Sequence, residues 1–143
     1  MPYRYLEDIA TADVAFEAWG NTVEEMFLAA SEATMHVMVE DPDSIGRAER
    51  RTITVQDDAL DMLLFQFLQE LIFYKDADML LLRVGSLRIA RDGGRLTLFA
   101  EARGEEIDRQ KHELSVDVKA VTLYRFGVVE TEGGWKATVV LDL

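Results

Sequence analysis

The chain has 143 residues, of which 49% are hydrophobic, and it carries a net charge of −12 at pH 7. This length and composition predict one folded domain, residues 1–143, rather than a disordered chain. The absence of cysteine excludes disulfides, a thiol nucleophile and a Cys-ligated zinc site, and the acidic charge argues against direct binding to nucleic-acid phosphates.

The first part of the chain predicts two short strands and a helix. YRYLED (3–8) and the alternation over 14–19 are strand-like. Thr22 followed three residues later by Glu25 is a capping-box pattern, and apolar residues then recur at helical spacing. Pro42 ends this amphipathic helix because proline cannot continue one.

A strand and a second helix come next. Ile53 and Val55 alternate with threonines, which predicts a strand. The segment 57–78 has a broad apolar face, and Asp57 or Asp58 is expected to cap it. A helix this apolar is expected to be covered by a sheet on one side and by the first helix on another.

The second half of the chain predicts two β-hairpins. Strand-like runs flank Asp92-Gly93-Gly94 and, later, Glu132-Gly133-Gly134. Two helices followed by these strands predict an α+β, two-layer sandwich. We expect the two helices to pack on one face of a largely antiparallel (mixed) β-sheet.

The sequence has no recognisable catalytic motif. It has no P-loop, no GxSxG and no HExxH. His36 lies near the apolar stripe of the first helix, which is typical of a core or boundary histidine. His112 lies in a polar connector, where it is either a solvated loop residue or a functional one. Without a nucleophile and base pair, we expect a protein that is not an enzyme.

Each of three charged residues can be interpreted in two ways. Asp13 follows the small residues 10–12 and either forms an Asx-turn or binds a cation. Asp142 shares a strand with Leu141 but belongs to the opposite face. It is expected to point away from the helix-covered side or across the sheet end, as either an ordinary strand end or a cation ligand. Lys119 is either a solvated strand lysine or, if held near these aspartates, a poised charge.

Four stretches, in order, resemble the archease family over nearly the whole chain. They are TADVAFEAWGNTVEEMF, LLFQFLQELIF, RQKHELSVDVKAVT and GGWKATVVLDL. Each motif is weak by itself, and the order of all four is what makes the resemblance specific.

The resemblance implies a function. Archeases are small α+β proteins that act as cofactors of the GTP-dependent tRNA-splicing RNA ligase. They assist guanylylation of the ligase and promote its multiple turnover without sealing RNA themselves. The implied partner is therefore the ligase, RNA is contacted only through it, and no membrane is involved. The oligomeric state is left open.

The resemblance also implies a divalent metal site, with calcium as the expected ion. The ligands on this sequence are Asp13, Asp142 and Leu143, the last through main-chain or terminal oxygens. Calcium takes oxygen ligands, so the residue types agree with the ion. Lys119 and His112 are implied as further functional or partner-contacting residues. If a terminal oxygen binds the ion, residues added after Leu143 should weaken binding.

The sequence departs from the family pattern at two places. Ala10 stands where many archeases have histidine, and Leu123-Tyr124 stands where many have Tyr-His. Two alternatives remain beside the activator: a metal-dependent phosphoester hydrolase that uses Asp13 and Asp142, and a chaperone-like interaction module. The sequence begins with no apolar leader segment and has no run long enough to span a bilayer, so we expect a cytoplasmic protein.

Overall fold

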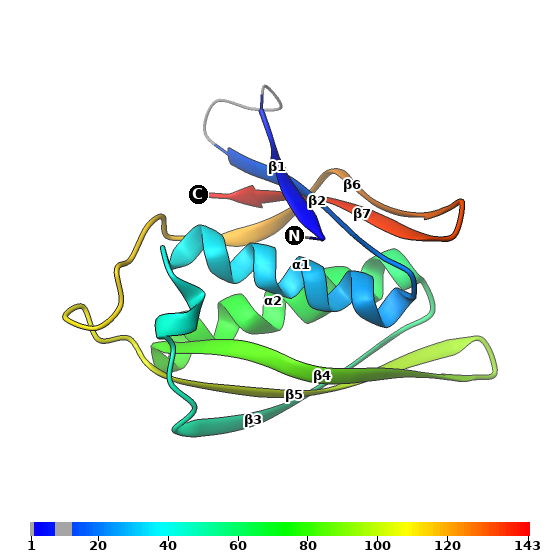
Figure 1. Ribbon diagram of the computed structural model, residues 1–143. Coiled ribbons are helices and arrows are strands. Elements are labelled where there is room, and N and C mark those ends of the chain that lie inside the picture. Colours follow the sequence, from blue (N-terminus) through cyan, green and yellow to red (C-terminus); the bar gives the residue numbers. More distant parts are fainter. Residues whose placement is uncertain (1, 8–12) are drawn as a thin grey trace.

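The computed structural model describes residues 2–7 and 13–143 (Figure 1). Strands and helices follow one another in the order β1 (Tyr3–Leu6), β2 (Asp13–Gly20), α1 (Val23–Met38), the 3₁₀ turn η1 (Pro42–Ser44), β3 (Glu49–Asp57), α2 (Leu60–Asp78), β4 (Leu80–Asp92), β5 (Arg95–Glu106), β6 (Ala120–Thr131) and β7 (Gly134–Asp142). The predicted α+β class is confirmed, and every pairing between the described strands is antiparallel.

The strands form two sheets, and the two helices lie between them (Figure 1). One sheet has the order β1-β2-β7-β6 and the other β3-β5-β4. The sequence predicted an α+β sandwich with a single sheet, whereas here both helices contact both sheets. The physical reason is the width of the apolar surface on the helices, which one sheet would leave partly exposed. On α2 alone the buried apolar residues are Leu63, Leu64, Phe67, Leu68, Leu71 and Ile72.

Local sequence signals determine where α1 begins and where the two hairpins turn. The Thr22 hydroxyl accepts a hydrogen bond from the Glu25 N–H, and the Glu25 carboxylate accepts one from the Thr22 N–H, so the capping box is present. Gly93, Gly94 and Gly133 adopt positive φ in the two hairpin turns, a conformation that glycine takes without strain. Both predicted hairpins are therefore confirmed.

The cap of α2 differs from the prediction. Ala59 occupies the N-cap position and makes no side-chain cap bond. Asp57 instead accepts a hydrogen bond from the Ala59 N–H at 3.0 Å, and so shapes the turn before the helix. The prediction was wrong because β3 extends to Asp57, which moves the start of the helix to Leu60.

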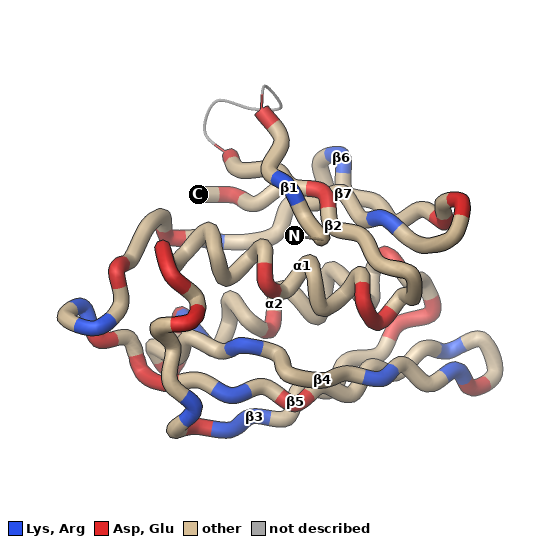
Figure 2. Tube along the Cα trace, viewed as in Figure 1, with Lys and Arg blue, Asp and Glu red and all other residues tan. Residues whose placement is uncertain are grey.

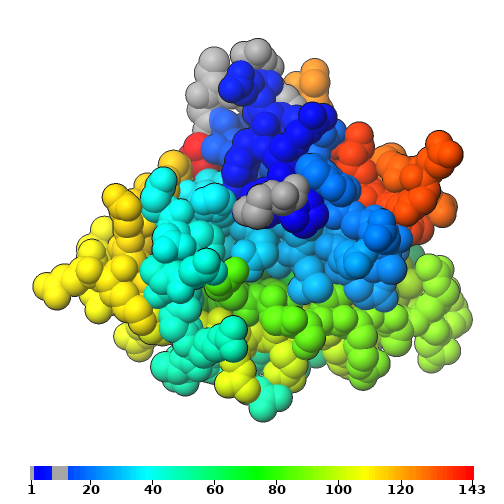
Figure 3. Space-filling view, in the orientation of Figure 1, coloured from blue at the N-terminus to red at the C-terminus, as the bar shows by residue number. Residues whose placement is uncertain are grey.

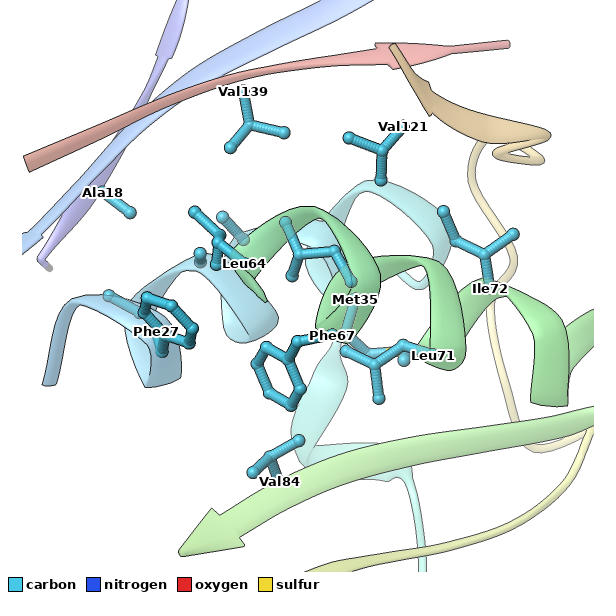
Figure 4. Packing of buried hydrophobic residues seen from close by; sticks show 14 of the residues in the cluster. Ala18, Phe27, Met35, Leu64, Phe67, Leu71, Ile72, Val84, Val121 and Val139 are labelled. Atoms are coloured by element: carbon cyan, nitrogen blue, oxygen red, sulfur yellow. The ribbon is translucent and has the colours of Figure 1, made fainter. Parts of the chain in front are cut away.

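The core lies between the two sheets and is centred on the helices (Figure 4). Phe27 of α1 and Phe67 of α2 stack with ring centroids 6.0 Å apart, and both are fully buried. Val121 and Val139 reach this core from one sheet, and Val84 reaches it from the other. In the part of the chain that the structure describes, neither helix is both long enough and apolar enough to cross a membrane.

Candidate functional site

Asp13 and Asp142 lie side by side at one end of the four-stranded sheet. β2 begins at Asp13 and β7 ends at Asp142, and the antiparallel register places the two residues directly opposite each other. Ala120, at the start of β6, is the partner of Asp142 on its other side. Segments from both ends of the chain and from the β5–β6 connection therefore meet here. We call this end of the sheet the paired-aspartate end.

Two carboxylates in this position repel each other. Residues directly opposite on antiparallel strands have Cβ atoms about 4.5–5.5 Å apart, and like charges at that separation destabilise the pair. Within residues 2–7 and 13–143 no ion pair neutralises Asp13 or Asp142. Asp142 is exposed and Asp13 half-buried, so both side chains can turn toward one cation from solvent.

The donor set suits a hard cation that keeps water ligands. Calcium takes six to eight oxygens, including carboxylates, carbonyls and water. Among the described residues no group of three His, Cys, Asp or Glu side chains could complete a metal site. A main-chain or terminal oxygen of Leu143, which follows Asp142 directly, is a further oxygen close to this end.

Lys119 is tied to the same end through its backbone. Its N–H donates to the main-chain carbonyl oxygen of Asp142 at 2.8 Å, a contact that does not involve the Asp142 carboxylate. The Lys119 side chain is exposed and precedes β6, which begins one residue later. Lys119 was expected inside a strand, and it lies just outside one.

Asp142 is exposed, in agreement with the expectation that it does not face the helix-covered side. Ala137, Val139 and Leu141 are fully buried on the helix-facing side of β7, and Asp142 alternates away from them. Val140 is also fully buried although it belongs to the opposite face, so alternation alone did not predict the burial of every β7 residue.

A buried lysine, Lys75, holds the segment that leads to Lys119. It lies in α2, is 5% exposed, and its ammonium pairs with Asp117 and donates to the Val118 carbonyl at 2.7 Å. It also contacts Asp76 at 2.9 Å. Sequence patterns did not single out this residue as functional. The signal was a lysine four residues after Leu71, in line with the apolar face of the helix.

His112 anchors the β5–β6 connection from inside. Its Nδ1 accepts from the Asp108 N–H at 3.0 Å and its Nε2 donates to Glu105 at 2.7 Å. These partners fix the neutral tautomer that carries hydrogen on Nε2. The ring is 1% exposed. Of the two alternatives for His112, the solvated loop residue is therefore wrong, because the connection folds back over the ring. A buried ring is also not positioned to contact a partner directly.

Glu105, near the end of β5, binds two residues of the same connection. It pairs with Lys111 at 2.5 Å and accepts from the His112 ring. The Lys111 ammonium, followed by the Gly46 N–H, lowers the pKa of Glu105 to about 2. The connection 107–119 thus lies against the segment that follows α1 (Figure 3), with the Glu40 N–H donating to the Glu113 carbonyl.

The remaining predicted positions are not part of the paired-aspartate end. His36 is a boundary residue whose Nδ1 lies 3.2 Å from the Tyr3 hydroxyl, as expected. Leu123 and Tyr124 are 61% and 53% exposed in an irregular part of β6. Ala10 and the small-residue turn before Asp13 lie outside the described residues.

Known proteins match this sequence over nearly its full length. The model of the Archease protein family (MTH1598/TM1083) matches residues 3–143. The chain belongs to the archease family. Protein archease of Methanosarcina mazei is 34% identical over 142 residues, covering 99% of this chain and 95% of that protein. Protein archease of Methanothermobacter thermautotrophicus is 35% identical over 133 residues, with 93% and 94% covered.

Solved structures of archease type have the same fold. The solution structure of protein 1598 from Methanobacterium thermoautotrophicum aligns with a TM-score of 0.86 at 33% identity, covering 99% of each chain. The crystal structure of an archease from Thermotoga maritima, described as a possible chaperone, aligns with a TM-score of 0.64 at 21% identity, covering 94% of this chain and 93% of that one. At that identity the second likeness concerns the archease fold alone.

Proposed function

We propose that this protein is a non-enzymatic activator of the GTP-dependent tRNA-splicing RNA ligase. It promotes guanylylation of the ligase and its multiple turnover in tRNA splicing and RNA repair. Membership of the archease family supports the class of function. The observation that carries the proposal is the direct cross-strand pairing of Asp13 with Asp142, which concentrates negative charge at one exposed end of the molecule.

In this proposal the paired-aspartate end binds a divalent cation, with calcium the first choice. The carboxylates of Asp13 and Asp142 and an oxygen of Leu143 hold it. The cation supplies positive charge and coordination positions that these residues leave open for water or for a group on the ligase. Lys119 contributes through its main chain by fixing Asp142, and its exposed ammonium is available to the ligase surface.

The histidines favour an activator over a hydrolase. A metal-dependent hydrolase needs a general base near the bound water. Both ring nitrogens of His112 are occupied by Asp108 and Glu105, and His36 contacts Tyr3. No histidine is therefore assigned to proton transfer.

Burial of the methionines favours a specific partner over a general chaperone. A general chaperone would present a flexible apolar face to many unfolded chains. Met26, Met35 and Met38 are each at most 3% exposed and lie in the core. The Met-rich face of α1 therefore stabilises this fold and is not offered to a client.

The test is ligation by the cognate tRNA-splicing ligase with GTP and cleaved tRNA halves. Sub-stoichiometric wild-type protein should raise both the guanylylated fraction of the ligase and the number of products per ligase. The protein alone should ligate nothing. D13N and D142N should abolish the stimulation, because each removes one negative charge while keeping the shape of the side chain.

An exposed carboxylate outside the site provides the control. Glu130→Gln on β6 removes the same charge from an exposed position and should stimulate like wild type. Full stimulation by both aspartate variants would show that activation of the ligase does not depend on Asp13 and Asp142. If the isolated protein hydrolysed a phosphoester and a chelator abolished this activity, the protein would be a metal-dependent hydrolase and not an activator.

A further inference from the structure

Arginines gather on the outer face of the three-stranded sheet, on the far side of the molecule from the sheet that carries the aspartates. Blue segments recur along β3, β4 and β5, although the chain as a whole is strongly acidic (Figure 2). In the central strand, Arg103 lies directly opposite Arg50 on one side and Arg83 on the other. Three guanidinium groups therefore start from one row across the sheet.

Such a row is unfavourable for folding by itself. Like charges directly opposite each other destabilise a strand pair. Arg83 is neutralised by Glu32, at 3.0 and 2.9 Å, and by Asp43 at 2.8 Å. Arg50 pairs with Glu101 at 2.7 Å. Among residues 2–7 and 13–143 no carboxylate forms an ion pair with Arg103, which is exposed at the centre of the row.

The row borders a hollow of about 760 Å³. Arg47 lines the same hollow, is also exposed and has no ion pair to the described carboxylates. Its other lining includes the three arginines of the row, three carboxylates and the small residues Gly85 and Ser86. The guanidinium groups of Arg47 and Arg103, which form no ion pair within the described part of the chain, and that of Arg50, which pairs with Glu101, therefore line this hollow. Arginine suits a phosphate because its planar fork donates two parallel hydrogen bonds.

A stacking surface lies on the same face. The Arg88 guanidinium lies 4.1 Å from the centroid of the Phe99 ring. Phe99 precedes Arg103 by four residues on β5, which is about 13 Å along a strand. This separation accommodates a base near the ring while a phosphate of the same strand lies at Arg103. A cationic groove beside an aromatic surface is the usual arrangement for single-stranded nucleic acid, whereas binding of an acidic peptide does not require the ring.

We propose that the outer face of β3, β5 and β4 binds single-stranded RNA, with Arg103 and Arg47 on the phosphodiester backbone and the Arg88–Phe99 surface under a base. This goes beyond the proposed function, and only the choice of RNA over DNA rests on it. The net charge argues against RNA binding in general. However, charges more than about 10 Å away are largely screened at 0.1 M salt, so the local arginines dominate at this face.

The test is fluorescence anisotropy of a labelled oligouridylate of about 12 nucleotides with the isolated protein. Wild type should bind at low salt and weaken as salt rises from about 50 to about 200 mM. R103E and R47E should each weaken binding several-fold. The slope of log K against log salt should become shallower by about 0.7 for each phosphate that the variant no longer neutralises. R125E is the matched control, since Arg125 is exposed on the other sheet, and it should bind like wild type.

A further variant, F99L, and a second probe test whether the aromatic ring contacts a base. Inorganic pyrophosphate, which has phosphates but no base, is the second probe and should also bind to the wild type. F99L keeps an apolar side chain but removes the aromatic face, so it should weaken binding of the oligouridylate and leave binding of pyrophosphate unchanged. Melting curves should show that all variants remain folded. No binding by wild type, equal binding by R103E, or equal loss in R125E would overturn the proposal. Tighter, Arg103-dependent binding of an oligoglutamate peptide would also overturn it, in favour of an acidic protein partner. Because no ligase is present, failure here leaves the activator proposal intact.

Discussion

Single charged residues fix the connection between β5 and β6 and, through it, the segment that contacts Asp142. Glu105 holds the connection at one end through Lys111 and His112. Lys75 holds it at the other end through Asp117 and Val118, next to Lys119. The paired-aspartate end is thus supported by two ionic contacts that are buried or half-buried. Each of them makes a testable contribution to stability.

The low pKa of Glu105 predicts a dependence of stability on acid. Its pKa is about 2 in the folded protein and 4.5 ordinarily. The folded state therefore binds this proton less readily than the unfolded state. The resulting stabilisation is complete above about pH 4.5 and is lost as the pH falls toward 2. Denaturant unfolding at several pH values should show a shallower loss over this window for E105Q than for wild type.

The control is E106Q, which removes an exposed neighbouring carboxylate and should keep the wild-type profile. An E105Q profile identical to that of wild type would show that the contacts of Glu105 with Lys111 and Gly46 do not persist in solution.

Substitution of Lys75 tests the other contact. K75M keeps the aliphatic length of the side chain but leaves the Val118 carbonyl without its donor. A buried acceptor left unpaired costs about 1–3 kcal/mol, so the free energy of unfolding should fall by that amount. K136M removes an ion pair between the partly exposed Lys136 and Glu17, which keeps its other pair with Arg4, and should cost at most about 1 kcal/mol. Equal effects of the two variants would contradict the buried role of Lys75.

The sequence predicted the positions and contacts of some individual residues but not of others. Asp13 and Asp142 are 129 positions apart, and spacing could not bring them together; their pairing came from the family resemblance and is visible in the strand register. For His112 the polar neighbours left both a solvated and a functional residue open, and burial by a folded-back loop leaves no local pattern in the sequence. The row of Arg50, Arg103 and Arg83 could not be predicted either, because it depends on which strands pair and in which register.

At the scale of elements, close contact between β4 and β5 depends on one glycine. A Cβ atom on Gly104 would lie 1.7 Å from the Leu81 carbonyl oxygen and 3.0 Å from the Leu82 Cα. These are backbone atoms of the paired strand and cannot move aside cheaply. β5 is the central strand of its sheet, so a shift here also disturbs the pairing with β3.

G104A should therefore destabilise the protein by at least about 1–3 kcal/mol, the usual cost of overpacking. G85A is the matched control, because nothing lies within 4 Å of its added Cβ. It should change the free energy of unfolding by about 0.5 kcal/mol or less. Thermal or urea denaturation of the two variants measures the difference, and similar stabilities would contradict the close approach of the strands.

Elements with local signals were predicted well. The capping box and the Gly-Gly turns act within four residues, so the sequence carries them directly. The start of α2 and the position of Lys119 just before β6 differ from the prediction because strand pairing decides them. Asp57 pairs with Leu96, and Ala120 pairs with Asp142.

At the scale of the whole molecule, two sheets enclose one pair of helices. Alternation shows which residues of a strand are buried but not which sheet the strand joins, so a single sheet was the simplest expectation. The arrangement puts the paired aspartates on one sheet and the arginine row on the other (Figure 2). The helices between them form the shared core, and their packing holds the two surfaces in one body.

F67A tests that shared core. Phe67 is fully buried between the sheets, and truncation of a buried phenylalanine costs about 3–5 kcal/mol. Probes on the two sheets should lose structure in one transition, at a lower denaturant concentration than in wild type. F73A, at a position that is 56% exposed, should have little effect. Separate transitions for the two sheets would contradict a common core.

The pairing of Asp13 with Asp142 as a cation site is tested most directly by titration of the isolated protein with calcium in a calorimeter. The wild type should bind one ion, D13N and D142N should each lose the binding heat, and E130Q should keep it. Both aspartate variants should also be at least as stable as wild type without calcium, because each relieves the repulsion across the strand pair. Undiminished calcium binding by both variants, or no binding by the wild type, would contradict the site.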